Sequence, residues 1–219
     1  MTRIKPLNQA EPRYELKYYA AAGEAFILKR RLSVLLKPDP HGARYTVNNI
    51  YFDDCRKTAL FEKTSGAYYK TKIRARFYNN DLSFIRLERK TKAGDLTKKT
   101  FAQIDESLLN AFCAGNAPSV DLERAEAQNV FCVERSIKGL RPAAEFSYER
   151  EAFVCPCGSV RITFDGAVNL KTGGAFVSTR GVIEIKFCEK LPDYIKKACS
   201  GLNLIRTDNS KYQLAMEKF

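Results

Sequence analysis

The sequence contains a single histidine and no tryptophan. His41 lies beside Gly42 in a loop rich in proline and glycine, which is typical of a solvent-exposed residue. One histidine excludes metal sites built from histidine clusters. The sequence also has no P-loop, no GxGxxG motif and no nucleophilic triad, so alternative nucleotide chemistries lack their usual signatures.

Long apolar runs and a disulfide framework are also missing. No run approaches the ~20 residues that a membrane-spanning helix needs, and the N-terminal stretch is polar, without the apolar segment of a signal peptide. The seven cysteines are scattered, with no CxxC pair, which favours a reduced set of thiols in a cytoplasmic protein. The stretch Cys155-Pro156-Cys157-Gly158 suits a turn, and no second Cys/His pair is spaced to complete a zinc site.

What the sequence has in excess is positive charge, with a net charge of +12 over 219 residues. This excess implies an anionic partner, which could be nucleic acid, a membrane surface or a phosphate-rich small molecule. Nucleic acid or a membrane would be favoured by a polybasic tail, but the basic residues mostly stand at alternate positions within predicted strands. Hydrophobic residues make up 45% of the chain, which is enough for an ordinary core.

Eight segments alternate charged or polar residues with apolar ones, which predicts β-strands that each have one charged and one apolar face. In the clearest segment, Lys72, Arg74 and Arg76 alternate with apolar residues, and the alternation resumes after a turn at 79–81. The predicted strands span residues 13–19, 44–53, 72–77, 85–90, 96–101, 142–154, 159–165 and 181–187.

Helical periodicity predicts helices over 20–36, 103–115, 122–138 and 192–199, with a last helical stretch after Ser210. The two helices in the middle form a helical insertion at about 103–138, beside the sheet. We therefore predict a single domain over residues 1–219, with an α+β fold.

Two arrangements fit strands of this kind. The apolar faces could meet in a core with the charged faces in water, or an antiparallel sheet could close into an eight-stranded barrel with a charged lumen and helices packed outside. The second is favoured because the amphipathic helices need an apolar face to cover, and because the charged faces are mostly Arg and Lys. Buried cations require polyanions, and glutamates among them require a divalent cation, so this barrel predicts a metal and triphosphate or polyphosphate site.

A series of motifs in one order carries a family resemblance. The motifs are Arg13-x-Glu15-x-Lys17, Ile50-Tyr-Phe-Asp53, Lys72-x-Arg74-x-Arg76, Glu88-x-Lys90, Tyr148-x-Arg150, Arg161-Ile-Thr-Phe-Asp165, Glu184-x-Lys186 and Ser210-Lys211. Together they resemble the VTC (vacuolar transporter chaperone) polyphosphate polymerase domain of the triphosphate tunnel metalloenzyme (CYTH-like) superfamily. The tunnel hydrolases of this superfamily carry Glu-x-Glu-x-Lys, and Arg13 at the first position here favours the polymerase-like branch.

The resemblance implies an eight-stranded antiparallel tunnel and roles for particular residues. It implies that the phosphate chain is held by Lys17, Arg74, Arg76, Lys90, Lys98, Tyr148, Arg150, Arg161, Ser210 and Lys211, and we add Arg86 and Lys186, which share these faces. Lys98 is chosen over Lys99 from period-two phasing with Thr100. The implied ligand of Mn²⁺ or Mg²⁺ is Glu184, while Glu15 and Glu88 either assist the metal or pair with the cations of the lumen.

The leading functional hypothesis is transfer of the γ-phosphate of ATP to a growing polyphosphate chain. A triphosphate or polyphosphate hydrolase, and a non-catalytic module that binds polyphosphate or inositol polyphosphate, remain alternatives. Nucleic acid is not expected, because the aromatic residues among the basic ones fall in the apolar phase of the strands. Related tunnels resemble modules attached to membrane proteins, so a membrane-protein partner is compatible with the resemblance.

Overall fold

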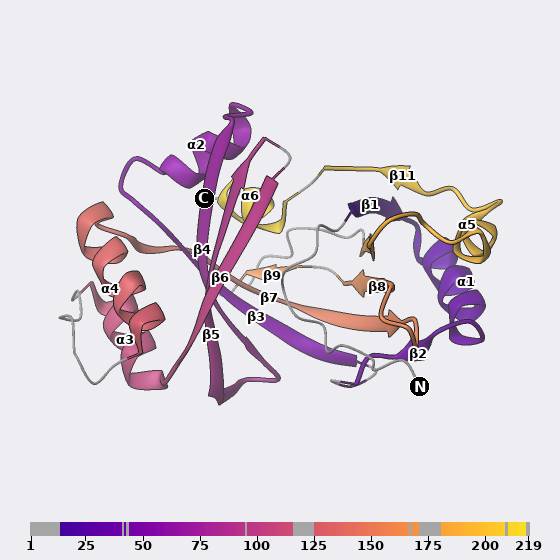
Figure 1. Ribbon diagram of the computed structural model, residues 1–219, viewed down its shortest axis with the longest axis horizontal. Helices are drawn as coiled ribbons and strands as arrows, with labels where there is room; N and C mark the ends of the chain where they lie inside the picture. The colour runs from indigo at the N-terminus through magenta and orange to yellow at the C-terminus, as the bar shows by residue number, and fades with distance from the viewer. Residues whose placement is uncertain are drawn as a thin grey trace. The chain divides into compact units, whose positions relative to one another are not determined.

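The computed structural model of the protein describes residues 14–40, 42, 44–94, 96–115, 125–166, 168–170, 181–208 and 210–217. Arg13 and His41, which enter the predictions above, lie outside the described residues, as does the start of the predicted helix at 122–138. Figure 1 shows the arrangement of the elements along the chain.

The described residues form eleven strands and six helices. The strands are β1 (Tyr14–Ala20), β2 (Lys37–Pro38), β3 (Arg44–Asp53), β4 (Tyr69–Tyr78), β5 (Asp81–Ala93), β6 (Leu96–Ile104), β7 (Arg141–Val154), β8 (Val160–Asp165), β9 (Asn169–Leu170), β10 (Gly181–Phe187) and β11 (Ile205–Arg206). The helices are α1 (Ala22–Ser33), α2 (Thr58–Thr64), α3 (Glu106–Ala114), α4 (Glu126–Lys138), α5 (Asp193–Cys199) and α6 (Lys211–Met216).

The strands belong to one antiparallel sheet with the hydrogen-bonding order β11-β1-β10-β8-β7-β3-β4-β5-β6, while β2 and β9 each pair with β7. The eight predicted strands correspond to β1, β3 to β8 and β10, and the three strands that the sequence does not predict have two residues each. The predicted α+β class and antiparallel sheet are confirmed. Closure into a barrel is not detected, because no strand pairing within the described ranges joins the two ends of this order.

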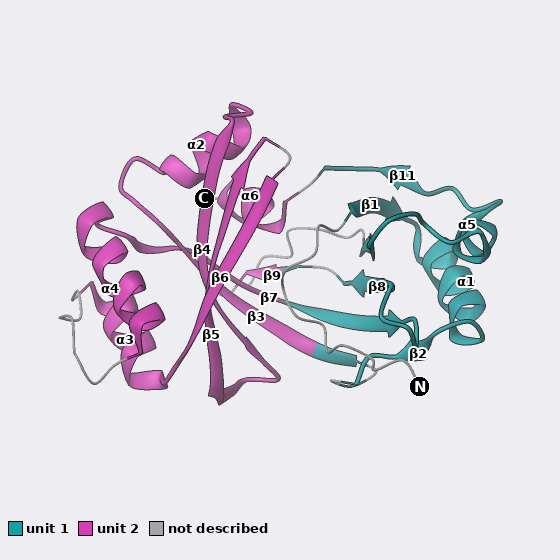
Figure 2. Ribbon diagram, in the orientation of Figure 1, with its two compact units in different colours: residues 1–45, 148–168, 178–209 teal, residues 46–147, 169–177, 210–219 magenta. Residues whose placement is uncertain are grey.

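The contacts within the chain define two compact units, which Figure 2 shows in different colours. Unit 1 comprises residues 1–45, 148–168 and 178–209, and unit 2 comprises residues 46–147, 169–177 and 210–219. The chain passes between the units within β3 and within β7. The single domain over 1–219 stays a prediction.

In unit 2, the apolar face of β4, β5 and β6 packs against α3 and α4. Alternate residues such as Ile73, Ala75 and Leu87 lie in one buried cluster with Phe112 of α3 and Phe131 of α4. The charged residues of β4 and β5 occur at the positions between them, and side chains alternate across a strand. The helical insertion therefore covers the apolar face, as predicted, and leaves the charged face of these strands on the other side.

Unit 1 has the same construction from different elements. Ile162 of β8 and the alternate residues Ile183 and Ile185 of β10 are buried with Leu28 of α1 and Ile195 of α5. The positions between them on β10 carry Glu184 and Lys186, which occupy the opposite face. In both units, the apolar strand residues pack against helices. The charged strand residues between them therefore point to the opposite face of the sheet. Within the described part of the chain, no helix is long and apolar enough to cross a membrane.

Candidate functional site

The charged face of unit 2 contains a row of three lysines. Lys72 of β4 lies opposite Lys90 of β5, and Lys90 lies opposite Lys99 of β6. Side chains directly opposite on neighbouring antiparallel strands are about 5 Å apart at Cβ, so like charges in such a row repel one another. A multivalent anion would relieve this repulsion.

Two further cross-strand pairs between β4 and β5 have the same sign of charge. Arg76 lies opposite Arg86, and Lys70 lies opposite Lys92. On the same face, Arg74 lies opposite Glu88, which is the one pair of opposite charge in this stretch of the register. Like-charged pairs therefore lie on both sides of Glu88, whose carboxylate pairs with Arg74, Arg76 and Arg86. Such an excess of positive charge suits phosphate binding.

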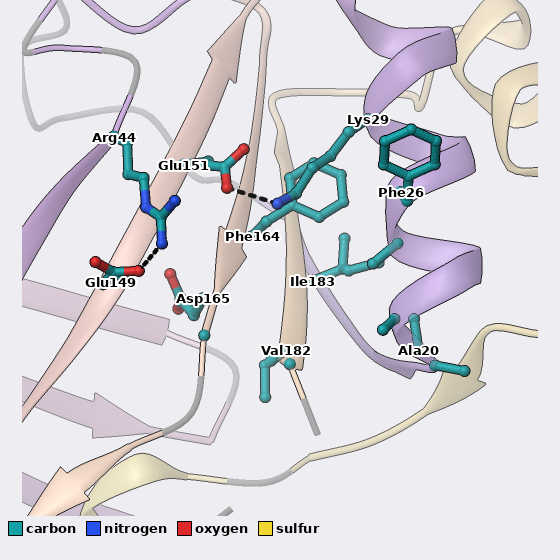
Figure 3. A pocket seen from close by; sticks show the side chains of 15 residues that line it. Ala20, Phe26, Lys29, Arg44, Glu149, Glu151, Phe164, Asp165, Val182 and Ile183 are labelled. Carbon is teal, nitrogen blue, oxygen red and sulfur yellow. Dashed lines mark hydrogen bonds and ion pairs between the residues drawn. The ribbon is translucent and has the colours of Figure 1, made fainter. Parts of the chain in front are cut away.

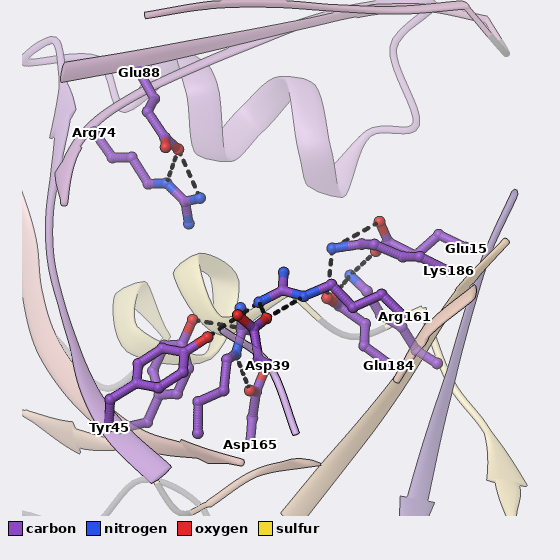
Figure 4. Close-up of polar contacts among 12 residues, drawn as sticks. Glu15, Asp39, Tyr45, Arg74, Glu88, Arg161, Asp165, Glu184 and Lys186 are labelled. Atoms are coloured by element: carbon purple, nitrogen blue, oxygen red, sulfur yellow. Dashed lines mark hydrogen bonds and ion pairs between the residues drawn. The ribbon is translucent and has the colours of Figure 1, made fainter. Parts of the chain in front are cut away.

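Glu88 binds two arginines of β4. Nε and Nη2 of Arg74 donate to the same carboxylate oxygen of Glu88 at 2.9 and 2.8 Å (Figure 4). Nη2 of Arg76 donates to the other oxygen of Glu88. Burial raises the pKa of Glu88, but the charges of Arg74 and Arg76 and the hydrogen bonds of Arg74 outweigh this effect and lower the pKa to about 2. Glu88 is thus ionised at neutral pH and holds both guanidinium groups in fixed positions.

Two arginines on this face have N–H donors that make no hydrogen bond to Glu88, although Arg86 Nε lies 3.8 Å from its carboxylate. Nη1 of Arg74 donates to Asn49 at 3.3 Å and to the hydroxyl of Tyr51 at 3.1 Å, so β3 also orients this guanidinium. Nε of Arg86 is buried and has no hydrogen-bond acceptor within the described part of the protein. Because buried donors are rarely left unsatisfied, Arg86 Nε is a candidate contact for a bound anion.

The last helix supplies Ser210 and Lys211 to unit 2. Lys72 Nζ donates to the hydroxyl of Ser210 at 3.0 Å, and Lys211 begins α6. Tyr212, on the next position, donates its hydroxyl hydrogen to buried Asp53 at 2.6 Å and stacks on the ring of Tyr51 at 4.8 Å. Burial and the hydrogen bond to Asp53 raise the pKa of Tyr212 well above its ordinary range, so it remains protonated and anchors α6.

The charged face of unit 1 brings two glutamates and two lysines together on β1 and β10. Lys17 lies 3.0 Å from Glu15 and 3.6 Å from Glu184, and Lys186 lies 2.8 Å from Glu184 and 3.8 Å from Glu15. The strand register explains this, because Glu15 lies opposite Lys186 and Lys17 lies opposite Glu184. Figure 4 shows Glu15, Lys186 and Glu184 side by side.

The donor chemistry of this cluster fits a hard divalent cation. Two carboxylates provide oxygen ligands of the kind that Mg²⁺ and Mn²⁺ prefer, and Mg²⁺ sites commonly add substrate phosphates to one or two carboxylates. The buried hydroxyl of Thr163, opposite Glu184 on β8, has no hydrogen-bond partner among the described residues. No group of three or more His, Cys, Asp or Glu side chains in the described ranges could hold a metal unaided. Glu184 and Glu15 thus fit a metal that phosphate oxygens help to bind.

Two arginines of unit 1 are held by buried aspartates. Arg161 of β8 pairs with Asp39 at 2.6 Å and donates to the hydroxyl of Tyr45 at 3.1 Å (Figure 4). Arg150 of β7 donates to both oxygens of Asp165 at 2.6 and 2.8 Å. The two aspartates fix both guanidinium groups before any ligand binds.

Arg150 also donates to the hydroxyl of Tyr148 at 3.3 Å, which joins two residues that the sequence predicts for phosphate contact. Burial lowers the pKa of Arg150, but the charges of Tyr148 and Asp165 and the hydrogen bonds to Asp165 raise it well above its ordinary value. Arg150 therefore remains charged within the buried layer of the sheet.

The register of β6 corrects the phase on which Lys98 was chosen. Lys98 lies opposite Thr91, whereas Lys99 lies opposite Lys90. Lys98 consequently shares its face with Ala102, which is buried against the helices, and Lys99 shares the face of Lys90 and Glu88. The assignment of Lys98 to the charged face is wrong, and Lys99 takes its place.

A cavity of about 490 Å³ lies on the helix side of unit 1 (Figure 3). Its charged groups pair with one another, because Lys29 donates to Glu151 at 2.6 Å and Arg44 pairs with Glu149. Ile183, on the apolar face of β10, contributes to its floor. Asp165, the partner of Arg150, also lines this cavity, so carboxylates outnumber cations in its lining and do not favour a polyanion.

The predicted site residues thus fall into one cluster in each unit. Unit 1 holds Glu15, Lys17, Tyr148, Arg150, Arg161, Glu184 and Lys186, and unit 2 holds Arg74, Arg76, Arg86, Glu88, Lys90, Ser210 and Lys211. Lys98 also belongs to unit 2 but lies on the opposite face of its strand. Their assignment to phosphate or metal stays a prediction. The sequence analysis missed the residues that orient them, which are Asp39, Tyr45, Asn49, Tyr51, Asp53, Asp165 and Tyr212. Asp53 and Asp165 end two of the quoted motifs, which was a usable signal for them, whereas Asp39 stands between two prolines without any pattern.

Solved structures share this fold at low sequence identity. A protein of Pyrococcus horikoshii OT3, PH1819, matches with a TM-score of 0.51 and 18% identity over 94% of this chain and 99% of its own. A “putative adenylate cyclase” from Vibrio parahaemolyticus matches with a TM-score of 0.54 and 12% identity over 94% of this chain and 98% of its own. A structure with the same description from Bacillus halodurans has a TM-score of 0.51 and 15% identity over 86% of each chain. No curated protein matches the sequence.

At identities below 20%, these likenesses show a shared fold. The VTC domain family matches residues 12–219, nearly the whole chain. The protein therefore belongs to the VTC domain family, and the resemblance found in its motifs is confirmed.

Proposed function

We propose that this VTC domain is a metal-dependent polyphosphate polymerase that moves the γ-phosphate of ATP to the end of a polyphosphate chain. The observation that carries the proposal is the row of Lys72, Lys90 and Lys99, together with the Arg76–Arg86 pair on the same face beyond Arg74 and Glu88. A row of positive side chains attracts a linear polyanion that lies along it. Membership of the VTC family supports the same substrate class.

Catalysis of this reaction depends mainly on positioning and on electrostatic stabilisation. Arg74 and Arg76, held by Glu88, would offer their positive charge and remaining N–H donors to phosphate oxygens, while the lysines supply point charges. The attacking oxygen of a phosphate chain is already anionic, so the transfer needs no general base. A new P–O bond forms at the γ-phosphorus, the bond to the β-phosphate breaks, and a nucleoside diphosphate leaves.

Glu184, with Glu15, would hold the divalent cation, which when bound neutralises negative charge on the phosphates. Lys17 and Lys186 balance the two carboxylates and would turn towards phosphate oxygens in the complex. Glu88 is better suited to orient arginines than to bind metal, because Arg74, Arg76 and Arg86 all approach its carboxylate.

The purified protein, incubated with ATP, Mn²⁺ and a short polyphosphate primer, tests the proposal. Chain growth on gels should match the release of ADP, and removal of the metal with EDTA should stop both. A folded protein that makes no polyphosphate with any primer would contradict it. Phosphate release from tripolyphosphate without chain growth would instead identify a hydrolase, and tight binding without turnover would identify a polyphosphate-binding module.

A further inference from the structure

The turn between β7 and β8 brings two cysteines together. Cys155 N donates to Val160 O at 2.9 Å, and Gly158 N donates to Cys155 O at 2.8 Å, so the backbone closes a tight turn around Pro156. Gly158 has a φ of +73°, in the left-handed region that a glycine adopts without strain. The closed turn holds the side chains of Cys155 and Cys157 next to each other.

The two thiols are in contact, with their Sγ atoms 2.9 Å apart. Ser159 Oγ lies 2.9 Å from Cys157 Sγ, and the hydroxyl of Tyr194 donates to Cys155 Sγ at 3.5 Å. Hydrogen bonds from Cys155 and Ser159 lower the pKa of Cys157, which is also exposed. Cys157 thus combines the two properties of a reactive thiol, thiolate character and access.

Two thiols in contact could bind a soft metal or form a disulfide. Thiolates on a tetrahedral zinc lie about 3.8 Å apart, given Zn–S bonds of about 2.3 Å, so 2.9 Å is too short for that geometry. No group of three or more possible metal ligands occurs in the described ranges. The geometry therefore favours sulfur–sulfur chemistry.

We propose that Cys155 and Cys157 form a redox-active dithiol that exchanges with low-molecular-weight disulfides of the glutathione type. The Cys157 thiolate attacks one sulfur of the small disulfide, which forms a mixed disulfide on Cys157 and releases one thiolate. Cys155 loses its proton to solvent and attacks Cys157 Sγ, which forms the Cys155–Cys157 disulfide and releases the second thiolate. Two electrons pass from the dithiol to the small disulfide, which leaves as two thiols.

The product disulfide should be readily reduced again. It closes a loop of only a few atoms, so it removes little entropy from the unfolded chain and adds little to stability. It also lies at an exposed turn, where disulfides are accessible to thiols. The site therefore differs from a structural disulfide and functions in reversible exchange.

The full-length protein, reduced and then equilibrated with glutathione buffers of rising oxidised fraction, tests the proposal. After acid quenching and alkylation with N-ethylmaleimide, peptide mass mapping should find the 155–157 disulfide across the series, reversed by dithiothreitol. The Cys155→Ser variant should instead accumulate a glutathione adduct on Cys157, because its resolving thiol is gone. The Cys157→Ser variant should form neither.

Cys55 provides the matched control, since it is also an exposed free cysteine. In the reduced protein, Cys157 should be alkylated several-fold faster than Cys55, and Cys55→Ser should leave the 155–157 disulfide unchanged. Equal alkylation rates together with no 155–157 disulfide at any buffer ratio would overturn the proposal. Circular dichroism of each variant checks that the fold is kept, and the outcome does not depend on any activity towards phosphates.

Discussion

Lys90 on β5 lies directly opposite Lys72 on β4 and, on its other side, opposite Lys99 on β6. The three residues belong to three strands whose opposite faces are buried against α3 and α4. A shift of any one strand by one residue would expose its apolar side chains and bury its lysine. The hydrophobic core therefore fixes the positions of the three lysines. The repulsion within this row is the cost of a preformed anion site.

Lys99 and Lys98 form a matched pair for testing this site. Lys99→Ala should weaken tripolyphosphate binding about fivefold at low salt, because a charge-assisted contact at an exposed position is worth up to about 1 kcal/mol. Without ligand, the variant should be as stable as the parent protein or slightly more stable, since one repelling charge is gone. Isothermal titration calorimetry and thermal unfolding measure the two effects.

Lys98→Ala removes the same charge from the same strand on the opposite face. Its effect on tripolyphosphate affinity should be within a factor of two of the unchanged protein, because only long-range attraction is lost. Equal losses for Lys98→Ala and Lys99→Ala would mean that net charge, and not the row, determines binding.

This pair also marks where prediction from sequence succeeds and fails. The bounds of β3 and β10 agree with the predicted 44–53 and 181–187. In β10, Ile183, Ile185 and Phe187 alternate with Glu184 and Lys186, so its faces were predictable. In β6, the run Thr97-Lys98-Lys99-Thr100 is polar at every position, so no apolar residue indicates which face is buried. Only the pairing with β5 determines which lysine lies on the charged face.

The partners of the site residues were harder to predict than the residues themselves. Alternation predicted the faces of Arg74 and Arg161, but Arg161 pairs with Asp39, 122 residues away in sequence. Such a contact depends on tertiary packing, for which the local pattern around Asp39 gives no signal. The Tyr212–Asp53 hydrogen bond spans 159 residues and was missed for the same reason.

Glu88 should make the protein acid-sensitive in a defined pH range. The pKa of Glu88 is about 2 in the folded protein, against an ordinary value of 4.5. Between these two pH values, the carboxylate is protonated in the unfolded chain and ionised in the folded protein. The stabilisation is complete above about pH 5 and is lost as the pH falls from about 4.5 to 2, by up to about 3 kcal/mol. Urea unfolding between pH 2 and pH 6 measures it.

Glu88→Gln isolates this contribution from that of other carboxylates. The difference in unfolding free energy between the parent protein and Glu88→Gln should be largest near pH 6 and should shrink towards pH 2. Asp81→Asn, which changes an exposed carboxylate of the same strand, is the control and should give a much smaller change. A pH-independent difference for Glu88→Gln would show that its arginine contacts are not maintained in solution.

Tyr212 should contribute to stability through its hydroxyl. Tyr212→Phe keeps the stacking on Tyr51 but leaves buried Asp53 without this donor, so it should cost about 1–3 kcal/mol of unfolding free energy. Tyr68→Phe changes a largely exposed tyrosine and should have little effect. Urea unfolding at pH 7 compares the two, and equal stabilities would mean that the backbone N–H groups of Asp54, Ala59 and Leu60 satisfy Asp53 without Tyr212.

Glu184→Gln should raise the Mn²⁺ concentration needed for tripolyphosphate binding and should strengthen binding when no metal is present. Glu184→Gln keeps the volume of the side chain but removes a charge and a strong oxygen ligand. The Mn²⁺ concentration that half-saturates tripolyphosphate binding should rise about tenfold or more, as expected when a metal ligand is weakened. In EDTA, the same variant should bind tripolyphosphate more tightly than the parent protein, because Lys17 and Lys186 lose a competing carboxylate.

An affinity for tripolyphosphate that falls at limiting Mn²⁺ and rises in EDTA distinguishes a metal ligand from a simple ion-pair partner. Glu189→Gln, at an exposed carboxylate just after β10, is the control and should change neither measurement. If Glu184 only orients the two lysines, Glu184→Gln should change tripolyphosphate affinity by the same factor in Mn²⁺ and in EDTA. That outcome would remove Glu184 from the metal site and would leave its role in unit 1 as the partner of Lys17 and Lys186.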